Sequence, residues 1–379
     1  MAVFLEEMRK YRTSDIVAAL ERATDSLDLN LSGLRTALIK PNLVTGKNPR
    51  SAVVTHPSVT EAVIVFLRER GITEITIADG PGIGLDSDWV FEKSGYTALA
   101  RRLDVPLVCF NDLPRRARTW KYGEIGVPEL LEDVDLYVNI PKLKTHGYST
   151  MTLSIKNHKG MLSQEDKKLD HQLGLHDPLV QQAKLRPADL VVLDGIVGLE
   201  GDGPLNGRPI RSGVFAVSTS MLELDAAAAR LAGFDPVEIA HLRIAEEEGL
   251  GTLDPELLGS APTHSFVRAN EEFGRVANIY SWRDPTACSM CIDSFGGAVS
   301  LAVKDPRNWF SLAPKLLYWG LIGKLHILQG RQAVLPEANG KVVCFGKCTR
   351  DMAKREGLVH VAGCPPTAQE VAKTLRREL

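Results

Sequence analysis

The chain has 379 residues, of which 44% are hydrophobic and 24% are charged. These proportions are typical of a globular protein and exclude a disordered or fibrous chain, and the length suggests about two domains. The 45 basic and 47 acidic residues give a formal charge of −2. Because proteins that hold nucleic acid by neutralising phosphates are usually more basic, no nucleic-acid partner is expected.

Apolar runs alternate with helical patterns over the N-terminal two thirds of the chain. The runs, several of them β-branched, predict strands at 36–43, 73–78, 105–110, 134–140, 190–193 and 214–218. Apolar residues at helical spacing predict helices at 57–70, 88–103, 222–231 and 236–248. This order predicts an α/β fold with a mainly parallel sheet and helices on both faces. Functional sites in such sheets lie at the carboxyl ends of the strands.

Basic residues follow the strand predicted at 134–140, in a segment that we expect to be a loop. This segment and its continuation contain Lys142, Lys144, His146 and Lys156. A positive field of this kind favours an anionic ligand that carries a carboxylate or a phosphate. The alternative is a solvated basic surface, since charge runs usually face water.

We divide the candidate anion site into two sets of residues. Lys144, His146 and Lys156 are predicted to be catalytic. The predicted substrate-binding residues are Lys40, Asn42, Lys142, Asn157, Glu200 and Asp202. The two acids lie in the glycine-rich segment 198–204 and are candidates for proton transfer or for balancing the lysine charges, although that segment is equally compatible with a plain turn.

Five of the six cysteines lie in the last third of the chain, after a predicted linker at 261–263. Cys288 and Cys291 form Cys-x-x-Cys, a spacing at which two thiolates can bind one metal ion or one cluster. Cys348 and Cys364 lie in loops with glycine or proline, where the backbone can approach the sulfur atoms closely. These four cysteines are the predicted ligands of one [4Fe–4S] cluster.

Three alternatives to this ligand set remain open. Cys344 precedes Cys348 by four residues and is its main rival, although its position on a β-branched strand favours the core. Structural zinc would also take four cysteines. Finally, cysteine is often buried as a small apolar residue, so these cysteines could belong to the core.

The lysine-rich segment and the cysteine motifs lie in different parts of the chain. They predict an anion-binding α/β domain over residues 1–262 and a smaller α/β iron–sulfur domain over residues 263–379.

Two loops of the second domain resemble known cluster motifs. Residues 361–368 (VAGCPPTA) are similar to the last ligand motif of the proximal cluster in the small subunits of complex I and nickel–iron hydrogenases. Residues 346–348 (GKC) resemble the preceding ligand motif of those subunits. The first pair here is Cys-x-x-Cys rather than the adjacent cysteines of complex I. The resemblance therefore implies a local cluster motif and not membership of those families.

The N-terminal two thirds resemble the family catalogued as domain of unknown function 362 (DUF362). The similar stretches include IKPNL at 39–43, ADGPG at 78–82, VNIPKLKTH at 138–146, TLSIKNHKGM at 152–161 and DGIVGLEGDGP at 194–204. This resemblance implies an α/β fold and an association with iron–sulfur chemistry, without a settled reaction. The Lys-x-x-His segment is also similar, more loosely, to the N-terminal domain of lactate racemase, an analogy at the level of the fold.

These features together predict an iron–sulfur oxidoreductase that acts on a small organic anion and receives electrons from a donor protein. The alternatives are a non-catalytic electron-transfer or cluster-binding subunit, and a racemase- or isomerase-like enzyme with a structural metal site. We expect a cytoplasmic location, because no secretory signal or transmembrane segment is evident and the cysteines then remain thiols or metal ligands. The apolar stretch 309–328 is expected to be a packed helix, with partner docking or membrane-surface binding as alternatives.

Overall fold

The computed structural model describes residues 2–147, 149–269, 278–283, 290–304, 309–337 and 339–379. Its internal contacts divide the chain into two compact units. Unit 1 comprises Met1–Asp170 and His176–Ala269, and unit 2 comprises His171–Leu175 and Asn270–Leu379.

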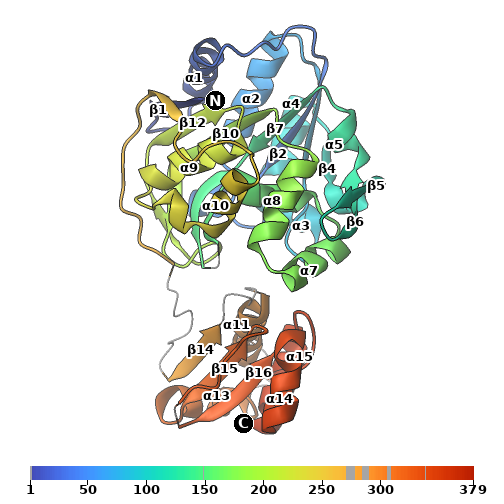
Figure 1. Ribbon diagram of the computed structural model, residues 1–379, viewed down its shortest axis with the longest axis vertical. Coiled ribbons are helices and arrows are strands. Elements are labelled where there is room, and N and C mark those ends of the chain that lie inside the picture. The colour runs from blue at the N-terminus through green and yellow to red at the C-terminus, as the bar shows by residue number, and fades with distance from the viewer. Residues whose placement is uncertain (1, 148, 270–277, 284–289, 305–308, 338) are drawn as a thin grey trace. The chain divides into compact units, whose positions relative to one another are not determined.

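Unit 1 is built on one large sheet, which within the described residues has 11 strands (Figure 1). The main path of the sheet follows the order β13-β1-β12-β10-β7-β2-β3-β4. Its strands are β1 (Ala2–Glu7), β2 (Thr36–Pro41), β3 (Glu74–Asp79), β4 (Leu107–Cys109), β7 (Leu136–Ile140), β10 (Leu190–Glu200), β12 (Val214–Ser218) and β13 (Glu256–Gly259). The pairs from β4 to β10 are all parallel, whereas β12 runs antiparallel to both β1 and β10.

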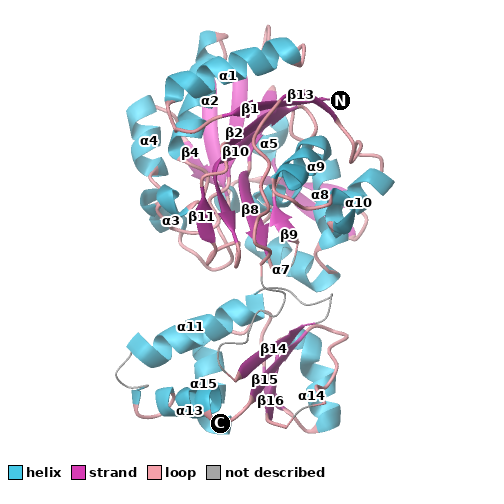
Figure 2. Ribbon diagram, turned by 90° about the vertical axis from the view of Figure 1, so that its left-hand side faces the viewer, coloured by secondary structure: helices cyan, strands magenta, loops and turns pink. Residues whose placement is uncertain are grey.

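Helices cover both faces of this sheet, so the predicted fold class is confirmed. Figure 2 shows α1 (Thr13–Ser26), α2 (Pro57–Glu69) and α4 (Tyr96–Leu103) on one side, and α8 (His176–Leu185), α9 (Met221–Leu231) and α10 (Ala240–Glu247) on the other. The remaining helices are α3 (Ser87–Lys93), α5 (Glu129–Asp133), α6 (Ser154–Asn157) and α7 (Gln164–Leu173). Because both faces are covered, a central strand such as β7 is buried at every residue, which explains its mainly apolar sequence.

Three shorter strands and a hairpin complete unit 1. Strand β8 (Lys142–His146) pairs with β10 and with β9 (Thr150–Thr152), and β11 (Arg208–Ile210) pairs with β10. Strands β5 (Arg115–Trp120) and β6 (Gly123–Pro128) form a separate antiparallel pair. The expected loop after β7 was therefore a wrong prediction at Lys142–His146, because these residues gain hydrogen-bonding partners from the long strand β10.

The helix predicted at 88–103 is divided into α3 and α4. Gly95 lies between them with φ of +81°, a left-handed conformation that glycine adopts without steric cost and that interrupts a right-handed helix. Strand β1, at the N-terminus, was not predicted. It has four apolar residues followed by two glutamates, and it is held by pairing with β12 and β13, which lie far away along the chain.

Unit 2 contains a parallel four-stranded sheet with the order β14-β15-β16-β17. These strands are β14 (Ile279–Arg283), β15 (Leu325–Gln329), β16 (Lys341–Phe345) and β17 (Val359–Val361). The helices in its described part are α11 (Met290–Lys304), α13 (Ala313–Leu321), α14 (Arg350–Glu356) and α15 (Ala368–Glu378). The single helix expected within 309–328 is instead α13 followed by the buried strand β15. No helix in the described part of the chain is long and apolar enough to span a membrane.

Candidate functional site

Strand β8 carries three of the predicted site residues in the interior of unit 1. Lys142 and Lys144 have no exposed surface, and only 5% of His146 is exposed. Asp194 and Leu199 of β10 are their neighbours in the sheet, opposite Lys142 and Lys144 respectively. The positive charge predicted for this segment therefore lies inside the unit and not on a solvated surface, so the groups around each lysine determine what it can do.

Lys142 forms a buried ion pair with Asp194. The Nζ–Oδ2 distance is 2.8 Å, and neither side chain is exposed. The hydroxyl of Tyr11 donates to the other carboxylate oxygen at 2.8 Å, and the backbone N–H of His56 donates to Oδ2 at 2.8 Å. Burial lowers the pKa of Lys142, and the charge of Asp194 opposes this shift. This lysine is thus neutralised within the fold.

Lys40, at the end of β2, forms a second buried ion pair with Asp79, at the end of the neighbouring strand β3. The Nζ–Oδ1 distance is 2.7 Å. The second oxygen of Asp79 accepts a hydrogen bond from the backbone N–H of Leu43 at 2.6 Å. We had not identified Asp79 or Asp194 as partners from the sequence. A usable signal was present for Asp79, because it ends a strand and begins the Asp-Gly-Pro-Gly segment at the same sheet edge as Lys40.

A relay of three asparagines connects the predicted residues Asn42 and Asn157. Asn42 donates to Asn157 at 2.8 Å, and Asn157 donates to Asn139 of β7 at 2.7 Å. The ammonium group of Lys144 donates to the side-chain oxygen of Asn42 at 2.7 Å and to the carbonyl of Val53 at 2.8 Å. Four side chains from four segments therefore form one buried hydrogen-bond network, in which Asn139 is the member that sequence reasoning missed.

Lys144 and Lys156 differ from Lys40 and Lys142 because, among the described residues, no carboxylate forms an ion pair with either of them. Burial lowers the pKa of Lys144 to about 7, and the charge of Lys142 adds to this effect. Burial likewise lowers the pKa of Lys156 to about 7, with a further contribution from Lys159. Lys156 is the more accessible of the two, since it is partly exposed. An amine with a pKa near 7 can both donate and accept a proton at neutral pH.

Lys156 and Asn157 are positioned by α6, a single helical turn that is anchored by the buried Asp225 of α9. Asp225 accepts hydrogen bonds from the backbone N–H of Ser154 at 2.7 Å, from its hydroxyl at 2.6 Å, and from the backbone N–H of Ile155 at 3.0 Å. An acidic group at the first turn of a helix satisfies amides that have no partner within the helix. Burial raises the pKa of Asp225 to about 7, and these hydrogen bonds act in the opposite direction.

The other predicted residues of the anion site lie in different surroundings. His146 Nδ1 accepts from the backbone N–H of Ser149 at 3.4 Å. Glu200 is buried, bonds to Arg208, and accepts from the backbone N–H of Val267 at 3.0 Å. Asp202 is exposed in the turn that follows β10. The carboxylates that pair with Lys40 and Lys142 are therefore Asp79 and Asp194, and Glu200 instead pairs with an arginine on β11.

Three of the predicted cysteine ligands lie in unit 2. Cys291 is in the first turn of α11, Cys348 follows β16, and Cys364 follows β17. A Cβ atom added to Gly346 would lie 3.0 Å from the sulfur of Cys291 and 3.5 Å from that of Cys348. The backbone N–H of Lys347 donates to the carbonyl of Gly363 at 2.9 Å, which joins the loop of Cys348 to that of Cys364.

The fourth predicted ligand, Cys288, lies outside the described residues. Among the residues that are described, no group of three His, Cys, Asp or Glu side chains could hold a metal ion. Cys344 is fully buried in a small apolar cluster with Leu328 and Ala353, and burial raises the pKa of its thiol to about 11. Cys109 belongs to the core of unit 1.

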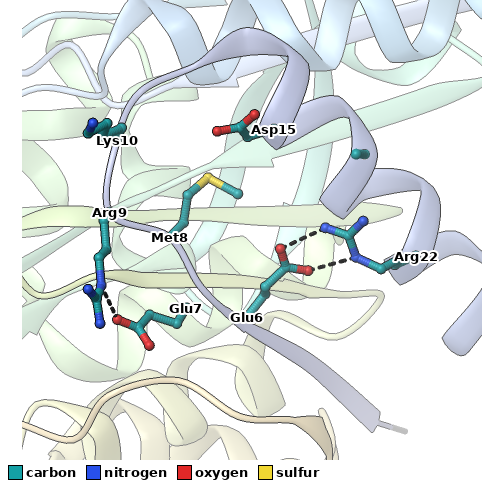
Figure 3. A pocket seen from close by; sticks show the side chains of 8 residues that line it. Glu6, Glu7, Met8, Arg9, Lys10, Asp15 and Arg22 are labelled. Carbon is teal, nitrogen blue, oxygen red and sulfur yellow. Dashed lines mark hydrogen bonds and ion pairs between the residues drawn. The ribbon is translucent and has the colours of Figure 1, made fainter.

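A surface pocket lies elsewhere in unit 1, between β1 and α1 (Figure 3). Its lining residues are Glu6, Glu7, Met8, Arg9, Lys10, Asp15, Ala18 and Arg22. Arg22 pairs with Glu6 at 2.7 Å and Arg9 pairs with Glu7 at 2.6 Å, so much of the charge in its walls is neutralised locally. None of the predicted site residues lines this pocket.

From the low pKa of Lys144 we predict how the stability of the protein depends on pH. Because the ordinary pKa of lysine is about 10.4, the unfolded chain binds more protons at this group than the folded chain between pH 7 and pH 10. The free energy of unfolding should therefore rise with pH in this window, with a contribution of at most about 1.4 kcal/mol per pH unit from Lys144. Urea denaturation at several pH values should show a smaller slope for Lys144→Met. The control Lys184→Met, at a surface pair with Glu248, should keep the full slope.

A second prediction concerns Asp225, which anchors α6 through hydrogen bonds. Asp225→Asn places an amide N–H₂ against at least one of the N–H or O–H donors that now point at the carboxylate, so the variant should lose about 1–3 kcal/mol of unfolding free energy. The control Asp254→Asn, at a side chain that is 95% exposed, should change it by less than about 0.5 kcal/mol. Equal stability of the two variants in urea denaturation would contradict the anchoring role.

Comparison with solved structures gives two weak likenesses. The apoprotein of lactate racemase from Thermoanaerobacterium thermosaccharolyticum aligns with a TM-score of 0.39 and 12% identity, over 98% of this chain and 90% of that one. A protein of Thermotoga maritima aligns with a TM-score of 0.43 and 12% identity, over 98% of this chain and 84% of that one. Scores of this size support no argument about function.

Comparison of sequences is more informative. The chain is 33% identical over 226 residues to the thylakoid-associated protein sll1697 of Synechocystis sp., which covers 58% of this chain and 70% of the relative. Residues 37–230, more than half of the 379, match the family described as domain of unknown function DUF362. This matched region contains the ion pairs of Lys40 and Lys142, the asparagine relay and α6. The chain therefore belongs to the DUF362 family.

Proposed function

We propose that this protein is an iron–sulfur oxidoreductase that acts on a small organic anion. Unit 2 would hold one [4Fe–4S] cluster through Cys288, Cys291, Cys348 and Cys364. The observation that carries this proposal is the approach of two of these sulfurs, from α11 and from the loop after β16, to the bare backbone of Gly346. A donor set made only of thiols suits an iron–sulfur cluster, and zinc is the main competitor.

The surroundings of the cysteines support this role. Gly346 has φ of +83°, and any side chain there would enter the space beside the sulfurs of Cys291 and Cys348. The backbone N–H of Gly330 donates to the sulfur of Cys348 at 3.4 Å, and such bonds favour a thiolate. When bound, a [4Fe–4S] cluster supplies a one-electron redox centre. Cys344 has no comparable setting, because it packs among apolar side chains.

In unit 1, the proposed chemistry assigns distinct roles to the lysines. Lys156, which is partly exposed and has a pKa near 7, would bind the anion and transfer a proton to or from it. Lys144 and His146 remain proposed catalytic groups behind it. Lys40 and Lys142 would hold the network in place through their aspartates. Reduction of a carbonyl or carbon–carbon double bond would consume two protons and two electrons, and the reverse reaction would release them.

The electrons would come singly from a small, acidic carrier protein. The exposed apolar surface around α13 suits such a partner, since Phe310 is 92% exposed and Ile322 is 75% exposed. Residues 309–328 contain Lys315 and Lys324 but no acidic residue, so this surface is complementary to a negatively charged partner. We propose a reducing compartment, the cytoplasm, for this reaction, because thiol ligands persist there.

A racemase- or isomerase-like activity is the second candidate. The observation in its favour is the presence of two amines with a pKa near 7 in unit 1, which could move a proton at the carbon beside a carboxylate without any electron transfer. In that case, the metal site of unit 2 would be structural. Reoxidation of the chemically reduced protein by an organic acid would support the oxidoreductase, whereas exchange of a substrate proton with solvent at a constant visible spectrum would support the isomerase.

Cysteine substitution provides the test of the cluster. Protein purified without oxygen should be brown, contain about four irons per chain, and bleach on reduction. Cys348→Ala should lose most of this iron, because it removes a thiolate ligand. The matched variant Cys344→Ala should retain it and lose on the order of 1 kcal/mol of stability through packing. Colourless protein with one zinc per chain, or full iron content in Cys348→Ala, would contradict the proposed ligand set.

A further inference from the structure

Three helices on one side of the sheet of unit 1 bring together basic side chains that the proposed mechanism uses only in part. Lys156 lies on α6, His176 begins α8, and His241 lies on α10. Helix α8 packs against both α6 and α10, and Figures 1 and 2 show α8 and α10 side by side. The two imidazole rings are stacked, with centroids 5.8 Å apart and planes inclined by 17°.

The imidazole of His241 is buried in an unusual way. It has no exposed surface, and neither of its ring nitrogens has a hydrogen-bond partner in the described structure. The buried Nδ1 of His176 also has none. A neutral imidazole always carries one N–H donor and one acceptor, and leaving them unsatisfied in the interior is unfavourable. His158 is equally buried and also has one ring nitrogen without a partner, Nε2, but its Nδ1 bonds to the hydroxyl of Tyr137 at 3.0 Å, so His241 differs in lacking a partner at both nitrogens.

The charges around the two histidines indicate which kind of group would satisfy them. Burial lowers the pKa of both imidazoles, and so does the charge of Lys156; Arg243 adds to this effect at His176. The acidic group that acts on Lys156 is Asp170, and its two oxygens are engaged by the ammonium group of Lys159 and by the side-chain amide of Gln182, each at 2.5 Å. The resulting positive potential favours an anion and disfavours a metal cation.

We propose that Lys156, His176 and His241 form the subsite that binds the oxyanion group, a carboxylate or a phosphate, of the substrate. This inference rests on the proposed binding of a small organic anion by unit 1. Lys156 and His176 are both partly exposed, whereas His241 has no exposed surface. His241 donates its N–H to the oxyanion, a charge-assisted hydrogen bond that replaces the missing partner. Neither histidine was among the residues predicted from the sequence.

Anion binding to the full-length protein tests this subsite. Sodium acetate and sodium phosphate, each compared with sodium chloride at equal ionic strength, serve as probes of the two oxyanion types. At about 100 times its dissociation constant, a probe that binds only the folded chain should raise the melting temperature by several degrees. Calorimetric titration of the same probes then gives the dissociation constant.

Substitutions at His241 separate binding from folding. His241→Leu removes both ring nitrogens at similar volume and should weaken binding of the probe about tenfold or more, without lowering the melting temperature measured in chloride. His241→Gln keeps a donor and should restore part of the binding. The control His264→Leu removes a hydrogen bond to the carbonyl of Ser212, so it should lower the melting temperature but keep the anion-dependent rise. If His241→Leu does not fold, ¹⁵N resonances of the histidine rings in the unmodified protein should shift on addition of the probe.

The outcomes distinguish this inference from the proposed function. If neither probe stabilises or binds the unmodified protein, the proposed anion binding by unit 1 is wrong, and the subsite is wrong with it. If a probe binds the unmodified protein and His241→Leu equally well, or leaves the ring resonances of His176 and His241 unchanged, only the subsite is wrong. Binding of one probe and not the other, weakened in His241→Leu, supports the subsite and identifies its oxyanion as a carboxylate or a phosphate.

Discussion

Three lysine side chains, those of Lys40, Lys142 and Lys144, lie in the interior of unit 1 without exposed surface. Burying an ammonium group is costly unless a carboxylate or several acceptors compensate it. This cost explains why acceptor groups at the edge of the sheet lie next to each of the three ammonium groups. Lys40 pairs with Asp79, and Lys142 pairs with Asp194. Lys144 instead donates hydrogen bonds to the side-chain oxygen of Asn42 and to the carbonyl of Val53. The result is an interior with different electrostatic settings for lysines that are close in sequence.

This arrangement is not explained by stability alone. Buried ion pairs contribute little more to stability than apolar residues of the same volume, and often less. Two such pairs and a relay of three asparagines in one region are therefore not accounted for by stability, and clusters of buried titratable groups with shifted pKa values are typical of functional sites. The contrast between neighbouring lysines strengthens this view. Lys142 is neutralised by a carboxylate, whereas Lys144 has only uncharged acceptors and a pKa near 7.

Much of the fold could be predicted from local sequence, because buried parallel strands are continuous apolar runs. A strand was predicted at 134–140, and β7 occupies 136–140. Strand β8 was missed, because its lysines suggest a solvent-exposed loop and only its pairing with β10 makes it a strand. The nearness of Lys40 and Asn42 to one edge of the sheet could be predicted, because Lys40 lies at the end of the strand β2 and Asn42 directly follows it. Their acidic partners could not be singled out, since pairing of Lys142 with Asp194 depends on the register of two strands.

The stacked pair of His176 and His241 could not be predicted from the sequence either. His176 and His241 are separated along the chain by three strands, β10, β11 and β12, and by helix α9. Each lies in an ordinary helical sequence, so neither carries a motif. Only the packing of α8 against α10 brings their rings together. The loops of Cys348 and Cys364, by contrast, each follow a strand of one parallel sheet. Neighbouring parallel strands end at one edge, so these two loops lie at the same edge of the sheet, while the binding of a cluster there stays a prediction.

Helix α6 links the two polar regions of unit 1. Its consecutive residues Lys156 and Asn157 are about 100° apart around the helix axis, so they serve different neighbours. Asn157 bonds to Asn42 and Asn139 in the buried network, while the charge of Lys156 acts on the histidines of α8 and α10. The turn is only four residues long and depends on Asp225 for its position. A shift of this turn caused by an anion at Lys156 would therefore also move Asn157, and through Asn42 it would change the hydrogen bond that holds Lys144. One short helix can in this way couple the binding of an anion to the protonation of a buried amine.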